Sequence, residues 1–297
     1  MHGNDVRFFK YMSPESAIAS LESGTMRWSS PKLFNDPFDF PVSMDFTFTG
    51  EAIAEALTDE LVKMAYGPEE PIGDPNNQFV RACLLNRRLR NRPPAEDFRA
   101  FMTEANAETI KRFEDGQIQR RGFLSEFRDQ FAVFCVSAKK DDLLMWAHYA
   151  KDHTGCVIQF RCLPELDRPL SAAIKVNYVE NYPLIGRVDE YVKHLTGQSE
   201  IDYDNLFKIF AFTKSRHWAY EDEWRCVSKL HNHETGFDYE PFIQEEFEAI
   251  YIGHRASQEQ EHKNSILNAL GSKYPNTKIF SSSVNIQNYS MAFHENL

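Results

Sequence analysis

The sequence contains no long hydrophobic run. Its longer apolar stretches, such as FAVFCV at 131–136, fall far short of the roughly 20 residues that a membrane-spanning helix needs. The N-terminus, MHGNDVRFFKYM, has no basic start followed by an apolar stretch, so no signal peptide is expected. These absences predict a cytoplasmic protein that does not enter a membrane.

Cysteine is scarce and irregularly spaced. The chain has 5 cysteines, an odd number, and no C-x-x-C pair. Three of the cysteines fall within apolar, strand-like runs. The pattern favours buried, reduced thiols over a disulfide framework or a zinc site. The cysteines are Cys83, Cys135, Cys156, Cys162 and Cys226.

Several familiar motifs are also missing. The sequence has no G-x-G-x-x-G, no phosphate loop and no G-x-S-x-G elbow. His148 and His153 lie five positions apart, whereas a helical zinc pair needs a spacing of about three or four. The letters HNH at 231–233 stand in a polar stretch and are interpreted as a surface turn. We therefore expect no metal.

The net charge of -11 disfavours general binding to nucleic acid, because proteins that coat nucleic acid are usually basic. One segment departs from this average: RACLLNRRLRNR, at 81–92, has five arginines and no acidic residue. It is either the solvated face of an amphipathic helix, with Leu84, Leu85 and Leu89 turned inward, or a patch that contacts phosphates. The second interpretation makes candidate nucleic-acid contacts of Arg87, Arg88 and Arg90.

The order of predicted elements indicates an α+β fold. The first forty residues read as a strand at 7–12, a helix capped by Ser13 and ended by Gly24, a strand at 25–30 and a loop at 31–41. Residues 50–128 read as a helical insertion within a single domain that spans 1–297. The remaining elements do not alternate regularly, as they would in a doubly wound fold. Strands are expected at 131–137, 154–160, 174–179, 223–230, 247–253 and 277–283, and helices at 139–153, 203–214 and 257–275.

Each of the 4 tryptophans stands beside polar residues. Such a tryptophan can anchor a core, or it can line an aromatic cleft that stacks a flat ligand. Both interpretations are open from the sequence. The neighbours are Ser29 and Ser30 for Trp28, His148 and Tyr149 for Trp146, His217 and Tyr220 for Trp218, and Glu223 and Arg225 for Trp224.

Three ordered motifs carry a resemblance to a known family. They are FFKYMS with LESGTMRWSSPKLFNDPFD, then FCVSAKKDDLLMWAHYAKDHTGCVIQF, and finally RHWAYEDEWRCV with FEAIYIG. Together they resemble a bacterial family described as a domain of unknown function, over nearly the whole chain apart from the helical insertion. That family is in turn distantly similar to ADP-ribosyltransferases, which include toxins that modify nucleic acid.

The resemblance implies a fold, a substrate and a set of site residues. The fold would be an ADP-ribosyltransferase-like split mixed or antiparallel sheet, and the substrate would be NAD. Glu223 takes the place of the catalytic glutamate, Ser137 that of the turn after the middle strand, and Tyr11 that of the first-motif residue. This sequence has Tyr11 and Lys10 where many members have histidine. The protein would act as a toxin or phage-defence effector on nucleic acid or protein, with an antitoxin as a possible partner.

The residue types suit this chemistry. Cleavage of the bond between nicotinamide and ribose builds positive charge on the ribose, and a fixed carboxylate such as Glu223 stabilises that charge. Glu221, two residues earlier, lies on the same side of an extended chain and would orient or deprotonate the acceptor. Further candidate contacts to NAD are the aromatic residues Tyr11, Trp146 and Tyr149 and the polar residues Ser30, Asn35 and Asp36.

Other interpretations of the same residues remain open. Asn35 and Asp36 can serve turn chemistry alone. Arg225 can form a salt bridge with Asp36, Asp39 or Glu221 that braces the site. The acidic residues at 221–223 can all face water at a strand end. The protein can also be a non-catalytic module that binds a nucleotide or a protein, whereas a hydrolytic nuclease needs a metal cluster that the sequence does not suggest.

Overall fold

The computed structural model describes residues 6–41, 46–181, 184–258, 260–271 and 273–296. The chain divides into two compact units, which we call the sheet unit and the helical unit. The sheet unit comprises Met1–Phe40, Arg128–Asn181 and Ala211–Leu297, and the helical unit comprises Pro41–Phe127 and Tyr182–Phe210. The interpretation of residues 50–128 as an insertion within one domain stays a prediction.

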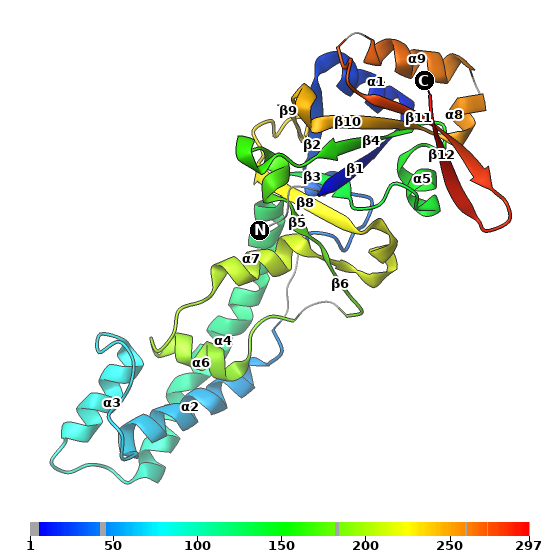
Figure 1. The fold of residues 1–297 in the computed structure, drawn as a ribbon. Coiled ribbons are helices and arrows are strands. Elements are labelled where there is room, and N and C mark those ends of the chain that lie inside the picture. Colours follow the sequence, from blue (N-terminus) through cyan, green and yellow to red (C-terminus); the bar gives the residue numbers. More distant parts are fainter. Residues whose placement is uncertain (1–5, 42–45, 182–183, 259, 272, 297) are drawn as a thin grey trace. The chain divides into compact units, whose positions relative to one another are not determined.

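The sheet unit holds the strands of the protein (Figure 1). The strands are β1 (Arg7–Met12), β2 (Thr25–Ser29), β3 (Phe131–Ser137), β4 (Cys156–Arg161), β5 (Ile174–Lys175), β6 (Asn177–Val179), β7 (Thr213–Ser215), β8 (Glu223–Lys229), β9 (Phe237–Pro241), β10 (Phe247–Ile252), β11 (Lys278–Asn285) and β12 (Ser290–Glu295). Its α-helices are α1 (Pro14–Ser23), α5 (Leu143–Tyr149), α8 (His254–Gln258) and α9 (Gln260–Leu270). Short 3-10 helices lie at Pro31–Leu33, Pro164–Leu166, Pro169–Ala172, Arg216–Glu221 and Gln244–Glu246.

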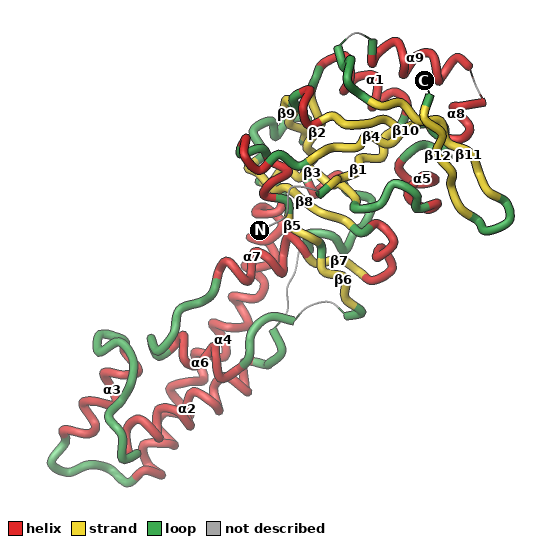
Figure 2. The backbone as a smooth tube through the Cα atoms, in the orientation of Figure 1, coloured by secondary structure: helices red, strands yellow, loops and turns green. Residues whose placement is uncertain are grey.

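The helical unit is built from helices, as Figure 2 shows. It contains α2 (Gly50–Tyr66), α3 (Gln78–Arg88), α6 (Val188–Leu195), and most of α4 (Ala95–Arg128) and α7 (Tyr203–Phe212). The helical pattern expected across 50–128 is therefore confirmed. Within the described ranges, none of the helices combines the length and the apolar character needed to cross a bilayer.

The strands of the sheet unit form a mixed sheet. Their order is β12-β11-β10-β4-β1-β3-β2-β9, and β8 pairs with both β3 and β5. β10 and β11 run parallel, and the other described pairs in this sheet are antiparallel. This combination of a mixed sheet with separate helices confirms the predicted α+β class.

The sheet opens along one edge of β3. β3 pairs with β8 from Phe131 to Ser137, but it meets β1 only at Ser137 and β2 only at Val133. Between these two points, the carbonyl of Cys135 accepts a hydrogen bond of 2.8 Å from Lys10 Nζ. β1 and β2 therefore diverge beside β3, and a long polar side chain replaces a neighbouring strand.

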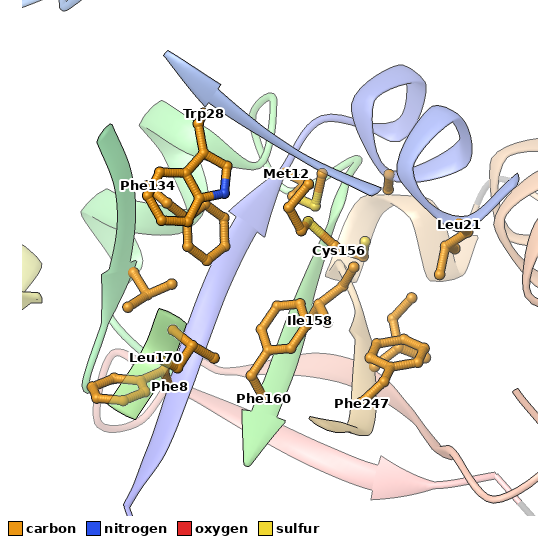
Figure 3. Close-up of a cluster of buried hydrophobic side chains, with 14 of the residues drawn as sticks. Phe8, Met12, Leu21, Trp28, Phe134, Cys156, Ile158, Phe160, Leu170 and Phe247 are labelled. Atoms are coloured by element: carbon orange, nitrogen blue, oxygen red, sulfur yellow. The ribbon is translucent and has the colours of Figure 1, made fainter. Parts of the chain in front are cut away.

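Alternation along the strands separates two buried clusters. Phe8 and Met12 of β1 face a core that includes Ile158 and, stacked at 5.6 Å between ring centroids, Trp28 and Phe134 (Figure 3). The next residues along β1 point to the opposite face of the sheet. There Phe9 and Tyr11 pack with Trp146, Val157 and Tyr251. The many aromatic residues thus fill both faces of the sheet.

Helix α1 follows the local signals of its sequence. The Ser13 side chain accepts a hydrogen bond from the Ser16 backbone, and Pro14 occupies the first helical position. Gly24 ends the helix in the left-handed conformation, at φ 73°. These three features confirm the predicted start and end of the helix.

Several predicted elements were wrong in extent. The helix expected at 139–153 is limited to α5, because Asp142 caps its start and Lys151, Asp152 and His153 adopt left-handed backbone angles after its end. The strand expected at 174–179 is divided into β5, which pairs with β8, and β6, which pairs with β7. The helix expected at 257–275 corresponds to α8 and α9, whose described residues begin earlier, at His254, and end earlier, at Leu270. The elements β9, β12 and α6 were not predicted from the sequence.

The arginine-rich segment only partly follows the amphipathic expectation. The buried residues of α3 are Val80, Cys83 and Asn86, whereas Leu85 and Leu89 are each 54% exposed. The expectation that Leu85 and Leu89 turn inward was therefore wrong. The buried face of α3 is instead the one that carries Val80, Cys83 and Asn86. Leu89 lies outside the helix, which ends at Arg88.

Two of the arginines serve the helical unit itself. Arg87 donates hydrogen bonds of 2.8 Å to the Met64 carbonyl and 2.7 Å to the Gly67 carbonyl, at the C-terminal end of α2. Arg92 stacks its guanidinium over the Tyr66 ring, at 3.9 Å from the centroid. Exposed carbonyl groups at a helix end need such donors. Arg88 and Arg90 are exposed and stay candidates for nucleic-acid contact.

We predict that Gly155→Ala lowers the free energy of unfolding of the sheet unit by about 1–3 kcal/mol or more, because the added methyl group has no free space at this position. A Cβ atom at Gly155 would lie 2.0 Å from the backbone oxygen of Met12, at the junction of β1 and β4. Gly116→Ala is the matched control, because a Cβ there meets nothing within 4 Å and alanine favours the interior of α4. Chemical denaturation followed by circular dichroism measures both; equal stability of Gly155→Ala and wild type would contradict the prediction.

Candidate active site

A cavity of about 760 Å³ lies in the sheet unit, where β1 and β2 diverge beside β3. Its volume falls within the range of about 300–1,000 Å³ that is typical of small-molecule sites. The residues that line it come from segments far apart in the sequence. Of the residues predicted from the sequence, the lining includes Lys10, Tyr11, Asn35, Ser137, Tyr149, Glu221 and Glu223.

A buried cluster of charged residues forms one side of this cavity. At its centre is Arg225, which is fully buried. Its guanidinium donates two hydrogen bonds to Asp39, of 2.8 and 2.6 Å, and two to Glu223, of 2.9 and 3.0 Å. A fifth bond, of 2.8 Å, goes to the carbonyl of Ala211. All five N–H donors of the arginine therefore have partners, and Asp39 and Glu223 are held in fixed orientations.

Lys214 links the two predicted catalytic glutamates. Its Nζ lies 2.5 Å from a carboxylate oxygen of Glu221 and 3.1 Å from one of Glu223. It also lies 3.6 Å from an oxygen of Asp39. The cluster thus contains three carboxylates (Asp39, Glu221 and Glu223) and two cations (Lys214 and Arg225). It carries a net charge of about -1 when every member is ionised, because the two cations offset only two carboxylates.

The two glutamates differ in how readily they hold a proton. Burial raises the pKa of Glu221 to about 7, and the attraction of Lys214 only partly offsets this effect. Burial also disfavours the charged form of Glu223, but Arg225 and Lys214 outweigh it and hold the pKa of that carboxyl below its ordinary value. Glu223 is therefore a permanent anion near neutral pH, whereas Glu221 can exchange a proton.

The local sequence explains how these groups reach one place. On β8, Glu223 lines the cavity and Arg225 lies on the same side of the strand, while the intervening Trp224 and the following Cys226 face the core on the other side of the sheet. Asp222 precedes the strand in the left-handed conformation, at φ 43°. The resulting turn brings both glutamates to the same cavity, but the expected extended chain was wrong, because Glu221 is the last residue of a 3-10 helix.

Ser137 fixes the backbone that carries Glu221. Its hydroxyl donates a hydrogen bond of 2.6 Å to the Glu221 carbonyl and accepts one of 3.0 Å from the Lys139 N–H. Ser137 stands at the end of β3, opposite Glu223 in the register of β3 and β8. The turn position predicted for Ser137 therefore supports the glutamates as well as lining the cavity.

Tyr149 and Tyr11 are positioned by hydrogen bonds. The Tyr149 hydroxyl donates a bond of 2.5 Å to Glu221, and Asn35 lies at 3.5 Å from the same hydroxyl. The Tyr11 hydroxyl donates a bond of 3.0 Å to the Lys139 carbonyl. Tyr149 therefore touches a predicted catalytic group directly, whereas Tyr11 contributes one ring to the wall of the cavity.

Three predicted NAD contacts lie outside the cavity lining. Trp146 is completely buried and packs edge-on against Tyr11, at 5.6 Å between ring centroids. Ser30 is buried as the cap of the 3-10 helix Pro31–Leu33. Asp36 is buried and accepts a hydrogen bond of 2.9 Å from the Phe38 backbone, which is the turn chemistry considered as an alternative. Trp146 therefore supports the wall formed by Tyr11, whereas Ser30 and Asp36 stabilise the local backbone.

The tryptophans do not form the aromatic cleft that the sequence suggested. Trp28 and Trp146 are core residues, and Trp224 packs against Phe8 at 5.4 Å. Trp218 is half-buried and its ring lies 5.0 Å from Lys214 Nζ. None of these four described residues lines the cavity. The aromatic side chains that do line it are Phe9, Tyr11, Phe34, His148, Tyr149 and Tyr239.

Sequence reasoning missed Lys214 and treated Asp39 only as one possible partner of Arg225. Lys214 is the last residue of the helix expected at 203–214, and its sequence context, FAFTKSRHW, gives no sign that its side chain is buried. The sequence did contain one signal for a second cation. If Glu221 and Glu223 are both buried, their two negative charges need more positive charge than Arg225 alone supplies. Of the three acids at 221–223, Glu221 and Glu223 are buried, so the alternative interpretation, in which all of them face water, was wrong.

We predict that the protein loses stability as the pH rises from about 4.5 to about 7. Glu221 has an ordinary pKa of 4.5 and a pKa of about 7 in the folded protein, so the folded state holds a proton that the unfolded state has released. This contribution is complete below pH 4.5 and disappears as the pH passes 7. Thermal unfolding measured across this range should show a falling midpoint in wild type and a flatter profile in Glu221→Gln. Parallel profiles for the two proteins would refute the assignment.

The cavity and its charge cluster can be compared with known proteins. No curated protein and no solved structure matches the chain. A family model described as "Protein of unknown function (DUF2971)" matches residues 145–226, less than a third of the chain. The matched segment begins at Met145 in α5 and ends at Cys226 in β8, so it includes Tyr149, Lys214, Glu221, Glu223 and Arg225. The part of the chain that supplies most of the charge cluster is thus similar to a family of unknown function.

Proposed function

We propose that this protein transfers ADP-ribose from NAD to an acceptor. The observation that carries the proposal is the placement of Glu221 and Glu223 side by side in one cavity, with one of them held ionised and the other able to exchange a proton near neutral pH. The opening of the sheet between β1, β2 and β3 supports an ADP-ribosyltransferase-like split sheet.

In this proposal, Glu223 stabilises the reacting sugar. The bond between C1′ of the ribose and the nicotinamide nitrogen breaks, nicotinamide leaves with the electron pair, and positive charge develops on the ribose. Glu223 is negatively charged, and its orientation is fixed by Arg225 and Lys214 before the reaction begins. A charge that is already oriented stabilises a transition state without further reorganisation, which is often the largest catalytic effect.

Glu221 would act on the acceptor. A carboxyl with a pKa of about 7 can accept a proton at physiological pH and release it afterwards. Tyr149 orients it through a short hydrogen bond. The proposed contacts to NAD are the lining residues Lys10, Tyr11, Asn35, Ser137 and Tyr149, while Trp146 supports the wall formed by Tyr11.

The test uses the full chain and NAD labelled in the adenylate portion. The proposal expects saturable binding of NAD, release of free nicotinamide, and label attached covalently to an acceptor when nucleic acid or protein is supplied. A wild-type protein that neither binds NAD nor releases nicotinamide with both classes of acceptor present would refute it.

A non-catalytic nucleotide-binding module is the second candidate. One observation favours it: Glu223 is only 5% exposed and both of its carboxylate oxygens are bonded to Arg225. In this candidate, the paired carboxylate of Glu223 has a structural role and keeps the cavity rigid. This candidate expects a nucleotide to bind with no release of nicotinamide.

The proposed reaction consumes NAD, so an unregulated enzyme would harm the cell that produces it. The proposal therefore includes a role as a toxin or phage-defence effector, for which such harm is the purpose. A cell that produces this toxin would also need a partner protein that neutralises it while the activity is not needed.

A further inference from the structure

Three aromatic side chains form a cluster beside Glu221, which we call the aromatic rim. Its members are His148 of α5, and Trp218 and Tyr220 of the 3-10 helix Arg216–Glu221. The ring centroids are 6.4 Å apart for His148 and Trp218, 6.0 Å for Trp218 and Tyr220, and 5.9 Å for His148 and Tyr220. His148 Nδ1 and the Tyr220 hydroxyl are hydrogen-bonded at 2.9 Å.

The rim is attached to the proposed proton acceptor at two points. Tyr220 precedes Glu221 in the chain, and Tyr149, which follows His148, donates its hydroxyl hydrogen to Glu221. His148 also lines the cavity. A ligand on the rim would therefore lie close to Glu221.

The rim remains accessible to solvent, in contrast to the core aromatic residues. Trp146 is completely buried and Trp28 is 5% exposed, whereas Trp218 and Tyr220 are half-buried and His148 is exposed. Trp218 belongs to none of the hydrophobic clusters found among the described residues. Lys214 Nζ lies over the Trp218 ring, 5.0 Å from its centroid, and the part of the half-buried ring that stays exposed is the surface offered to a ligand.

The chemistry of the rim fits a planar aromatic ligand. Aromatic side chains stack on nucleobases without regard to sequence, because every base has a π face. The net charge of -11 disfavours a long phosphate track. The aromatic rings and the negative charge of the protein therefore both favour contact with a base over contact with the backbone of the nucleic acid.

We propose that the aromatic rim binds one unpaired nucleobase of a single-stranded nucleic acid and presents it to Glu221 as the acceptor. This inference rests on the proposed function and names its acceptor class. In the transfer, a nitrogen of the base forms a bond to C1′ of the ribose as the bond from C1′ to nicotinamide breaks. Nicotinamide leaves with the electron pair, and the proton of the base nitrogen passes to the Glu221 carboxylate.

The test measures binding without NAD, so it does not depend on the reaction. Fluorescently labelled oligo(dT), oligo(dA) and oligo(U) are titrated with the full-length protein, and a duplex of dA and dT serves as the paired control. We expect the single strands to bind and the duplex to bind far more weakly, with little dependence on salt. Comparison of oligo(dT) with oligo(U) distinguishes DNA from RNA.

Trp218→Ala should weaken binding of the single strands about tenfold or more, and Trp218→Phe should retain most of it. Tyr289→Ala is the matched control, because Tyr289 is an aromatic residue that is 84% exposed on another part of the sheet unit. Thermal unfolding confirms that each variant is folded. Equal binding by Trp218→Ala and wild type would overturn the inference.

The result separates this inference from the proposed function. Release of nicotinamide and transfer to protein, with no binding of any single strand, would overturn the rim as a base-binding site and leave the transferase proposal intact. Binding of single strands that depends on Trp218, with no reaction of NAD, would support the rim and count against the transferase.

Discussion

Glu223→Gln is expected to lower the release of nicotinamide from NAD by about a hundredfold or more. The substitution keeps the size of the side chain and removes the negative charge that would face the developing positive charge on the ribose. Removal of one preorganised electrostatic group typically costs about a hundred- to a thousandfold in rate. The measurement is the initial rate of nicotinamide release by the full chain at saturating NAD.

Two further variants make this result interpretable. Asp222→Asn removes a neighbouring acid that pairs with Lys175 at 2.8 Å and does not line the cavity, so it should retain nearly all activity. Glu223→Asp keeps the charge and should retain more activity than Glu223→Gln. Circular dichroism establishes that each protein is folded. If Glu223→Gln were as active as wild type, Glu223 would not be the stabilising carboxylate.

The growth of a bacterial host gives a second readout of the same variant. If the protein acts as a toxin, expression of the wild type should slow growth, and Glu223→Gln should relieve this effect at equal protein levels. Growth inhibition by both proteins would separate the toxicity from the proposed reaction.

Arg225→Met is expected to lower the free energy of unfolding by about 3–5 kcal/mol. Methionine fills much of the volume of arginine but leaves Asp39 and Glu223 buried without their main cationic partner. Lys214 lies 3.6 Å from Asp39 and 3.1 Å from Glu223, so it can compensate for only part of the lost charge. Chemical denaturation of wild type and variant measures the difference.

Arg216→Met provides the comparison for this prediction. Arg216 forms an ion pair with Glu180, and both side chains are more than 60% exposed. Exposed pairs contribute about 0–1 kcal/mol, so this variant should be close to wild type in stability. The double variant Arg225→Met with Asp39→Asn should recover part of the loss, because it removes one of the two stranded charges. Similar stabilities for Arg225→Met and Arg216→Met would show that the buried cluster does not hold the fold together.

The sequence predicted the parts of the fold that short segments determine. Ser13, Pro14 and Gly24 define α1 by themselves, because caps and left-handed ends depend on neighbouring residues. The apolar run after Glu223 likewise predicted the strand at 223–230, which the structure shows as β8. The edge strand β12 was missed, since its mixed residues SMAFHE show no clear period.

The arrangement of the site was less accessible from the sequence. Glu221 and Glu223 were identified as a pair, but their burial depends on Lys214, whose own sequence context gives no sign that its side chain is buried. The sequence left the role of the tryptophans open because burial decides it, and burial is a property of the tertiary structure. Trp146 packs behind Tyr11, so a residue that looked like a ligand contact is a support.

The bonds between Asp39 and Arg225 have a consequence for synthesis of the chain. The two residues are 186 positions apart, so a growing polypeptide contains Asp39 long before Arg225 has been made. Contacts between such distant positions form late, because the intervening loop must first be closed. A nascent chain therefore cannot assemble the charge cluster until β8 has left the ribosome and paired with β3. Any property that needs the cluster is therefore absent until β8 has been made.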